Sequence, residues 1–250
     1  MTEIKVGFGE LMSSVKCVAF DKDGTLFDGS GFWRHVDMHR RAVFASMVGD
    51  EHVPSWSRLM GINHEHMDHQ GILAVASLQE EIIAVAGLMY QLKGWSWTQC
   101  LEKAAGLFRD ADSRLVIDKA FKSMEGAPEV FHLLRRAGIR AGILTSDTLT
   151  RTEDCMRLHG IRDQLDFVIT PEQVKYGKPS PDMVHTACEM LGLQPSELAV
   201  VGDSVVDMRM ARSAGSLAIG IVTYEGSAEV LAGEADALIH SLTEIRVEVD

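Results

Sequence analysis

The sequence predicts an α/β protein whose parallel sheet carries helices on both faces and whose first strand is followed by an all-helical insertion. Three observations support this prediction. After Gly126, helical patterns alternate with short apolar runs, which is typical of a parallel sheet covered on both sides. From about Ser30 to Met124, the apolar residues keep a helical spacing throughout. A glycine follows each helix of the alternating part, as it commonly does in C-caps.

The apolar run at residues 15–20 is the first expected strand, because it is short and rich in strand formers. Further strands are expected at residues 139–144, 167–169, 198–201, 217–222 and, more weakly, 237–239. The helices between them are expected at residues 128–137, 150–159, 181–191 and 205–214. In the insertion, helical spacing predicts helices over residues 33–48, 71–92, 98–109 and 113–124. Glycine-containing hinges then divide the chain into an α/β core domain, residues 1–28 and 126–250, and a helical cap domain, residues 29–125.

The composition is that of an ordinary globular protein, with 250 residues of which 46% are hydrophobic and 24% charged. The formal net charge of −12 disfavours nucleic acid and anionic membranes as partners, but a local cationic site can still bind a small anionic substrate. The four cysteines lack zinc-site or redox spacing, which indicates a reducing compartment. The first residues show no signal-peptide pattern, and charges interrupt the apolar stretch 72–92. We therefore expect a cytoplasmic protein without a membrane span.

Polar residues collect where the expected strands end, and ligands of open parallel sheets bind beyond those ends. These residues are Asp21 and Asp23 after the first strand, Thr145, Ser146 and Asp147 after the second, Lys175 and Lys178 after the third, and Asp203 and Asp207 after the fourth. Two carboxylates about 4 Å apart repel by about 4 kcal/mol at an effective dielectric near 20, so a compensating cation is expected. The oxygen ligands favour Mg²⁺, and the hydroxyl and lysine groups suit a phosphate.

The residues of Asp21-Lys22-Asp23 are expected to alternate in direction, as they do in an extended strand. Lys22 then points away from Asp21, and Asp23 returns to the same side. Gly24 permits a sharp turn directly afterwards. Partial burial beside another carboxylate would raise the pKa of Asp23, as a general acid requires.

Four segments resemble, in this order, the four motifs of the haloacid dehalogenase superfamily: FDKDGTL, the strand ending in LTS, GKPSPD and VVGDSVVD. Each motif alone is a weak signal, but here all four lie at or just beyond expected strand ends. The chain is most similar to the phosphoglycolate-phosphatase-like branch, over about residues 14–28 and 126–243. The resemblance implies a Rossmann-like core and a type-1 helical cap that closes over the site and selects the substrate.

The resemblance also implies roles for individual residues. Asp21 would be the nucleophile that forms an aspartyl-phosphate, and Asp23 the general acid and then the general base. Thr145 and the amide of Ser146 would bind the transferring phosphoryl group, while Lys178 would neutralise charge. The expected Mg²⁺ ligands are Asp21, the backbone carbonyl of Asp23, Asp203 and, through water, Asp207.

These roles imply a Mg²⁺-dependent phosphatase acting on a small phosphorylated metabolite, such as a phosphoglycolate-like compound or a sugar phosphate. A second aspartate at position 23 resembles both the phosphatases and the phosphomutases of the superfamily. A sugar phosphomutase is therefore one alternative, and a non-catalytic phosphate-binding protein that keeps the fold is another. The sequence identifies neither the ester nor the oligomeric state.

Several of these residues also have a purely structural interpretation. Thr145 and Asp147 could cap the following helix, as threonine and aspartate often do. Asp207 could be a solvated carboxylate in the first turn of its helix. Lys175 competes with Lys178 for the phosphate, and the Lys-Pro pair favours Lys178. The histidine-rich segment 63–69 could hold a metal ion such as zinc, could contact the substrate or could be an exposed loop, and its spacing matches no recognised ligand pattern.

Overall fold

The computed structural model describes residues 4–63, 66–115 and 121–249. Backbone contacts divide the chain into two units. Residues 1–28 together with 121–250 are called the core unit below, and residues 29–120 the helical unit. That the two units are separate domains, with boundaries after residue 28 and before residue 126, stays a prediction.

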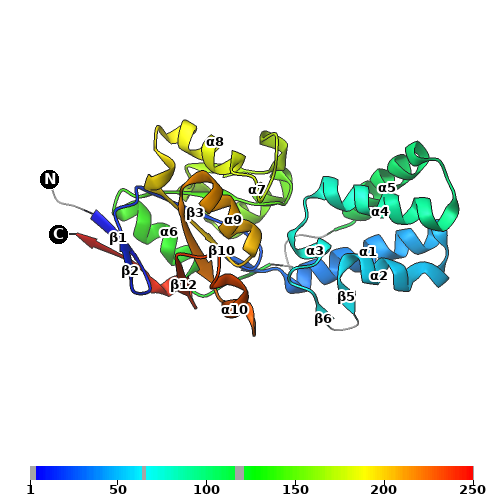
Figure 1. The fold of residues 1–250 in the computed structure, drawn as a ribbon, viewed down its shortest axis with the longest axis horizontal. Helices are drawn as coiled ribbons and strands as arrows, with labels where there is room; N and C mark the ends of the chain where they lie inside the picture. The colour runs from blue at the N-terminus through cyan, green and yellow to red at the C-terminus, as the bar shows by residue number, and fades with distance from the viewer. Residues whose placement is uncertain (1–3, 64–65, 116–120, 250) are drawn as a thin grey trace. The chain divides into compact units, whose positions relative to one another are not determined.

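The core unit is built on a six-stranded sheet in which all neighbouring strands are parallel (Figure 1). The strands stand in the order β12-β11-β10-β3-β8-β9. Their bounds are β3 Cys17–Phe20, β8 Arg140–Leu144, β9 Phe167–Ile169, β10 Leu198–Gly202, β11 Leu217–Ile221 and β12 Ala237–Ile239. The predicted parallel α/β architecture is confirmed.

Five α-helices accompany this sheet in the described part of the core unit. They are α6 Ala127–Arg136, α7 Leu149–Leu158, α8 Asp182–Leu191, α9 Val205–Ala214 and α10 Ser227–Leu231. Short 3-10 helices lie at η3 Arg162–Gln164, η4 Pro171–Gln173, η5 Pro195–Glu197 and η6 Leu242–Glu244. Helices α6 to α9 are predicted from the sequence, whereas α10 is too short to show a helical period.

Helices pack on both faces of the sheet. Successive residues of β3 point to opposite faces, so each of the two faces contributes apolar side chains to a helix contact. Ala19 belongs to a buried apolar cluster with Met183 of α8 and Met208 of α9. Phe20 packs on the other side against Phe131 of α6, with ring centroids 5.1 Å apart. The strand at the centre of the sheet is therefore buried on both faces, which explains its continuous apolar sequence.

The register of β3 brings the motif segments to one edge of the sheet. Phe20 lies opposite Ile143 of β8 and Val201 of β10. Because these strands are parallel, their carboxyl ends meet at the same edge. Asp21 thus leaves β3 at the level where β8 and β10 end.

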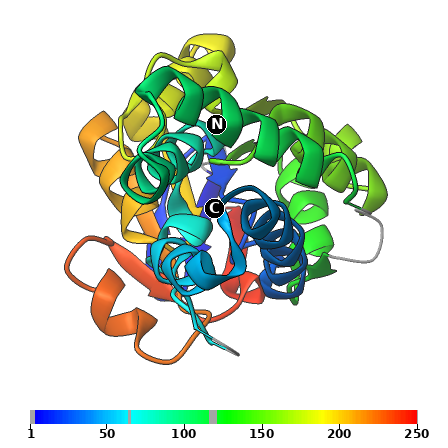
Figure 2. The ribbon, with the colours of Figure 1, turned by 90° about the vertical axis from the view of Figure 1, so that its right-hand side faces the viewer.

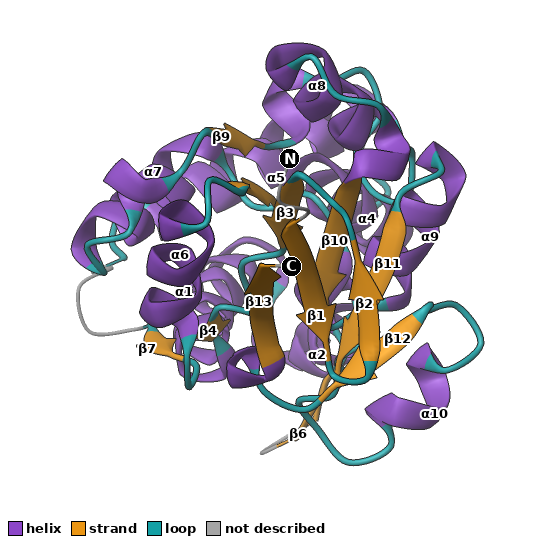
Figure 3. Ribbon diagram, turned by 90° about the vertical axis from the view of Figure 1, so that its left-hand side faces the viewer, coloured by secondary structure: helices purple, strands orange, loops and turns teal. Residues whose placement is uncertain are grey.

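A separate antiparallel sheet with the strand order β13-β1-β2 joins the two ends of the chain (Figure 3). Its strands are β1 Ile4–Phe8, β2 Leu11–Ser13 and β13 Ile245–Val249. A two-stranded ribbon pairs β4, Phe27–Asp28, with β7, Lys122–Ser123, where the chain leaves and re-enters the core unit. None of these strands is predicted from the sequence, because each is short and several mix polar with apolar residues.

The helical unit can be followed from blue to green in Figure 2. Its elements are α1 Ser30–Val48, η1 Asp50–His52, α2 Val53–Met60, β5 Ile62–Asn63, β6 His66–Met67, α3 Ile72–Val75, α4 Leu78–Lys93 and α5 Trp97–Asp112. Its buried centre includes Phe44 of α1, Trp56 of α2, Val85 of α4 and Phe108 of α5. Within the described residues, none of the helices combines the length and the apolar character that crossing a bilayer requires.

The structure corrects three expectations for residues 29–125, the predicted cap. The single helix expected at residues 71–92 is broken into α3 and α4, because Ser77 forms a capping box with Glu80 and starts a new helix. Residues 122–123 form a strand rather than the end of a helix, and residues 116–120 of that expected helix lie outside the described residues. Helix α2 and the hairpin of β5 and β6 are additional elements.

Candidate active site

One lysine side chain joins two carboxylates at the carboxyl edge of the sheet. Lys178, in the loop before α8, places its Nζ 2.5 Å from Asp21 Oδ1 and 2.6 Å from Asp207 Oδ1. The Lys178 side chain is only 2% exposed. The competing Lys175 is exposed and lies over the Tyr176 ring. The structure therefore brings Lys178, and not Lys175, to the carboxylates.

Asp203, directly after β10, completes a group of three carboxylates, called the acidic group below. One oxygen each from Asp21, Asp203 and Asp207 lies within 4.8 Å of the other two. Gly24 makes room for this arrangement, because its φ is +85° and a Cβ there would overlap the Asp203 carboxylate. The turn after the first motif and the end of β10 are thus packed against each other.

Asp207 is oriented by the start of α9. The amide and the hydroxyl of Ser204 both donate hydrogen bonds to Asp207 Oδ2, which forms a capping box. Oδ1 of the same carboxylate lies against Lys178. Asp207 is fully buried, so its interpretation as a solvated carboxylate is wrong.

The acidic group carries more negative charge than the neighbouring lysine balances. When ionised, three carboxylates and the Lys178 ammonium leave two net negative charges in a largely buried site. Burial raises the pKa of Asp21 to about 7 against the attraction of Lys178, and burial with the neighbouring carboxylates raises the pKa of Asp203 well above its usual value. A divalent cation that prefers oxygen ligands fits this donor set and balances its charge.

The acidic group is also distinctive within the part of the chain that the structure describes. There, no other three histidine, cysteine, aspartate or glutamate side chains come together in a way that could hold a metal ion. His64 and Glu65 of the histidine-rich segment lie outside the described residues. The possible zinc site in that segment therefore stays a sequence-based alternative.

The Asp23 carboxylate lies with Lys22 rather than in the acidic group. Lys22 Nζ is 2.7 Å from Asp23 Oδ1 and 2.6 Å from Asp23 Oδ2. A turn begins at Lys22, where the amides of Leu26 and Phe27 both donate to the Lys22 carbonyl. The expected alternation of the three side chains stays a prediction. The Lys22 side chain is fully buried. Burial raises the pKa of Asp23, although Lys22 opposes the shift.

Lys22 also contacts Asp147, which lies between β8 and α7. Asp147 Oδ2 is 3.1 Å from Lys22 Nζ, and Asp147 Oδ1 is 3.2 Å from Nη1 of Arg151, one turn along α7. The N-cap residue of α7 is Thr148, and its amide donates a hydrogen bond to Asp147 Oδ1. The interpretation of Thr145 or Asp147 as the cap is therefore wrong, and Asp147 serves as a link between two cations.

Thr145 and Ser146 follow β8 at the edge where Asp21 leaves β3. Thr145 is buried, and its amide donates to the carbonyl of Ile169 at 3.1 Å. Its hydroxyl oxygen accepts a hydrogen bond of 3.2 Å from the amide of Asp147. Ser146 is half-buried. The phosphate-binding roles of Thr145, Ser146 and Lys178 stay predictions, as do the catalytic and metal-binding roles of the aspartates.

Lys22 and Arg151 receive no role from the sequence analysis. Two signals for them are nevertheless present. A lysine stands between the two aspartates of the first motif, and Arg151 follows Asp147 by four residues, a spacing that favours ion pairs on a helix. Neither signal identifies the contact between Lys22 and Asp147, because that contact depends on how β3 and β8 pair.

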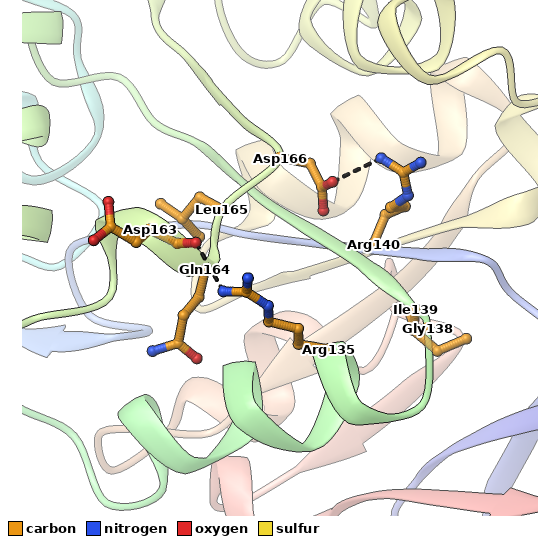
Figure 4. A pocket seen from close by; sticks show the side chains of 8 residues that line it. All are labelled: Arg135, Gly138, Ile139, Arg140, Asp163, Gln164, Leu165 and Asp166. Atoms are coloured by element: carbon orange, nitrogen blue, oxygen red, sulfur yellow. Dashed lines mark hydrogen bonds and ion pairs between the residues drawn. The ribbon is translucent and has the colours of Figure 1, made fainter.

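A pocket of about 280 Å³ lies away from the acidic group, at the amino end of β8 (Figure 4). It is lined by Arg135, Gly138, Ile139, Arg140, Asp163, Gln164, Leu165 and Asp166. Arg140 pairs with Asp166 at 2.7 Å, and Arg135 donates to the Asp163 carbonyl at 2.9 Å. Both arginines already have oxygen partners, so the pocket shows no site prepared for an anion.

The chain belongs to the haloacid dehalogenase-like hydrolase family, whose model matches residues 15–215. The matched segment contains the acidic group, Lys22 and Lys178. The superfamily predicted from the four motifs is therefore confirmed.

Two relatives are phosphatases. The phosphoglycolate phosphatase of Nitrosospira multiformis is 26% identical over 232 residues, which cover 92% of this chain and 93% of that protein. The validoxylamine A 7'-phosphate phosphatase of Streptomyces hygroscopicus subsp. limoneus is 36% identical over 124 residues, or 50% of this chain and 57% of that protein. The chain thus matches little more than half the length of the second relative.

Solved structures share the fold. One described as a predicted phosphoglycolate phosphatase from Haemophilus somnus has a TM-score of 0.70 at 16% identity, and the match covers 93% of this chain and 96% of that one. A likeness at this identity concerns the fold alone.

Proposed function

We propose that this protein is a Mg²⁺-dependent phosphatase of small phosphorylated metabolites that acts through an aspartyl-phosphate on Asp21. The observation that carries the proposal is the joining of Asp21 and Asp207 by Lys178, with Asp203 beside them at the carboxyl edge of the sheet. Such a site offers oxygen ligands to a divalent cation and an ammonium group to a phosphoryl group. Membership of a hydrolase family and two phosphatase relatives support the same chemistry.

In the first step, a carboxylate oxygen of Asp21 attacks the phosphorus atom of the ester. The bond from phosphorus to the alcohol oxygen breaks, and that oxygen takes a proton from Asp23, so the alcohol leaves as a neutral molecule. Lys178 balances the charge on Asp21 before the attack and on the phosphoryl group during it. The Thr145 hydroxyl and the Ser146 amide donate hydrogen bonds to the phosphoryl oxygens.

In the second step, a water molecule attacks the phosphorus atom of the phosphorylated Asp21. Asp23 accepts a proton from this water, and the bond between phosphorus and Asp21 breaks. The products are inorganic phosphate and a free Asp21 carboxylate. Asp23 is protonated again, so the cycle consumes one water and one ester.

Asp21, Asp203 and Asp207 would hold the cation, with the Asp23 backbone carbonyl as a further oxygen ligand. The chemistry that Mg²⁺ would supply there is electrostatic, namely stabilisation of the negative charge on the phosphoryl group. The three carboxylates are oriented for this by Lys178, Ser204 and the turn at Gly24.

The proposed substrates are phosphoglycolate-like compounds or sugar phosphates. The names of the two relatives support this class, because both act on small organic phosphates. The net charge of −12 argues against a nucleic-acid substrate. The four cysteines are free and buried, which supports a reducing, cytoplasmic compartment.

The test is phosphate release from p-nitrophenyl phosphate, with Mg²⁺ or with EDTA, by the wild type, Asp21→Asn and Asp154→Asn. Asp154 is a matched control, because it lies on α7 and pairs with Arg157 at the surface. We expect turnover by the wild type and the control with Mg²⁺ only, and a loss of about 10⁴-fold or more for Asp21→Asn. Robust turnover by Asp21→Asn, or turnover indifferent to EDTA, would remove the proposed mechanism.

The same assay separates the alternatives. A protein that binds Mg²⁺ yet hydrolyses none of a broad panel of phosphate esters is a binding protein. A protein that isomerises a sugar phosphate faster than it releases phosphate, and that a sugar bisphosphate activates, is a mutase.

A further inference from the structure

Lys22 is a fully buried lysine to which the proposed reaction gives no part. Its Nζ contacts both carboxylate oxygens of Asp23, at 2.7 and 2.6 Å, and Asp147 Oδ2 at 3.1 Å. The ring of Phe121 lies beside it, with the Nζ 4.4 Å from the ring centroid. Burial lowers the pKa of Lys22, but the carboxylates of Asp23 and Asp147 outweigh this and hold it above the usual value for lysine. Lys22 is therefore an ammonium ion.

Arg151 completes a buried network with Lys22, Asp23 and Asp147. Arg151 Nη1 is 3.2 Å from Asp147 Oδ1, so Asp147 lies between two cations. Burial alone would raise the pKa of Asp147, but Lys22, Arg151 and the Thr148 amide together lower it. Two carboxylates and two cations balance, so this network, unlike the acidic group, needs no metal ion for neutrality.

The network touches the proposed machinery at two points. Lys22 holds the carboxyl of Asp23, the proposed general acid and base. The amide of Asp147 donates to the hydroxyl of Thr145, a proposed phosphate-binding group. The two points belong to segments after β3 and β8, which are neighbouring strands. The network thus connects the proton donor with a residue that holds the phosphoryl group.

We propose that Lys22 is a positioning residue that anchors the Asp23 carboxyl and fixes its direction, with Asp147 and Arg151 holding Lys22 in turn. This inference rests on the proposed phosphatase function. A general acid must lie within hydrogen-bond reach of the leaving oxygen, and a carboxyl tied to a fixed ammonium has few orientations. Buried ion pairs are weak devices for stability alone. Orientation of Asp23 is what this network supplies.

The test uses Lys22→Met, which removes the ammonium and keeps an apolar stem, on three esters of increasingly basic leaving group: p-nitrophenyl, phenyl and ethyl phosphate. A nitrophenolate leaves without a proton, whereas an alkoxide needs one. We expect kcat/KM, which reports the transfer of the phosphoryl group to Asp21, to fall about 100-fold or more for ethyl phosphate and to change less than about threefold for p-nitrophenyl phosphate. Lys16→Met is the matched control, because Lys16 is exposed and pairs with Glu197.

Lys22→Met leaves Asp23 and Asp147 with a single cation, so the double variant Lys22→Met with Asp147→Asn is measured as well. It restores the charge balance, and we expect its Tm to recover while the selective loss on ethyl phosphate persists. With an active wild type, equal losses of kcat/KM on all three esters, or an unchanged or higher kcat/KM for ethyl phosphate, would overturn the role of Lys22 alone. A wild type that hydrolyses no ester would overturn the proposed function, and the role of Lys22 with it.

Discussion

Lys178 Nζ lies 2.5 Å from Asp21 Oδ1, although the two residues are 157 positions apart in the chain. The contact joins the end of β3 to the loop before α8. It places a buried ammonium at a carboxylate whose pKa burial raises to about 7. A lysine in this position can make Asp21 available as an anion and can also face an incoming phosphoryl group.

Replacement of Lys178 is expected to lower the catalytic rate, in addition to any effect on the stability of the fold. Lys178→Met should lower kcat by about 10²- to 10³-fold, because one charged donor to the reacting group is lost. Lys175→Met, three residues earlier and exposed, is the matched control and should stay within about twofold of the wild type. The measurement is the steady-state rate of the wild type and of both variants in the presence of Mg²⁺. A larger loss in the Lys175 variant than in the Lys178 variant would show that the wrong lysine has been placed at the phosphate.

Gly24 supports the acidic group by its lack of a side chain. Gly24→Ala forces an L residue to a φ of +85° and pushes a Cβ into the Asp203 carboxylate. Gly138→Ala forces a similar φ of +73°, with open space around the new Cβ. Both variants should lose about 1–2 kcal/mol of unfolding free energy from backbone strain. Only Gly24→Ala should also weaken Mg²⁺ binding, measured by calorimetry, and equal Mg²⁺ affinity in the two variants would contradict this placement of Asp203.

Mg²⁺ binding is expected to depend on pH because Asp21 must lose its proton. Its folded pKa of about 7 lies above the usual aspartate pKa of 3.8. The native metal-free protein therefore binds more protons than the unfolded chain between these values. The stability that the protonated Asp21 contributes is present below about pH 4 and is lost as the pH rises through about 7, at up to about 1.4 kcal/mol per unit.

Mg²⁺ competes with the proton for Asp21 and therefore binds more tightly above the pKa of this group. The increase in Tm caused by Mg²⁺ should thus be larger at about pH 8 than at about pH 5.5. Thermal melts in Mg²⁺ and in EDTA at both values provide the measurement. In Asp21→Asn the difference between the two pH values should shrink. An increase in Tm that is the same at both pH values in the wild type would be evidence against Asp21 as a ligand.

Arg40 is the corresponding buried cation of the helical unit. It donates to Asp112 at 2.8 and 2.7 Å and to Glu81 at 3.0 and 3.1 Å, and it lies over the ring of Phe108. Arg40→Met should lower the free energy of unfolding by about 3–5 kcal/mol, because the buried Glu81 carboxylate and the half-buried Asp112 carboxylate both lose this cation. Arg114→Met, which breaks an exposed pair with Asp110, should change it by about 0.5 kcal/mol or less. Urea unfolding followed by tryptophan fluorescence measures both, and equal values would contradict the buried network.

Much of the core unit could be predicted from the sequence because its strands are buried on both faces. β9, Phe167–Ile169, and α9, Val205–Ala214, begin and end at the predicted residues. A continuous apolar strand followed by a glycine-ended helix leaves few alternatives to a parallel sheet. Parallel pairing then places the residues after β3 and β10 together, which is why Asp21 and Asp203 could be expected to meet.

Other features depend on contacts that a local pattern does not contain. β1 and β13 lie near opposite ends of the sequence and pair with each other. Neither strand is long or apolar enough to be recognised alone. The break at Ser77 depends on a side-chain hydrogen-bond pair within an otherwise apolar stretch. The contact of the Asp23 carboxyl with Lys22 depends on the turn that begins at Lys22.

The central claim is that Asp21 becomes phosphorylated during turnover. The most direct measurement is to mix the protein with Mg²⁺ and a phosphate ester, quench with acid, reduce with borohydride and analyse the peptides by mass spectrometry. Reduction of an aspartyl-phosphate converts the aspartate to homoserine. We expect homoserine at position 21 in the wild type only when ester and Mg²⁺ are both present. Rapid turnover without modification of Asp21, or with modification of another residue, would contradict the claim.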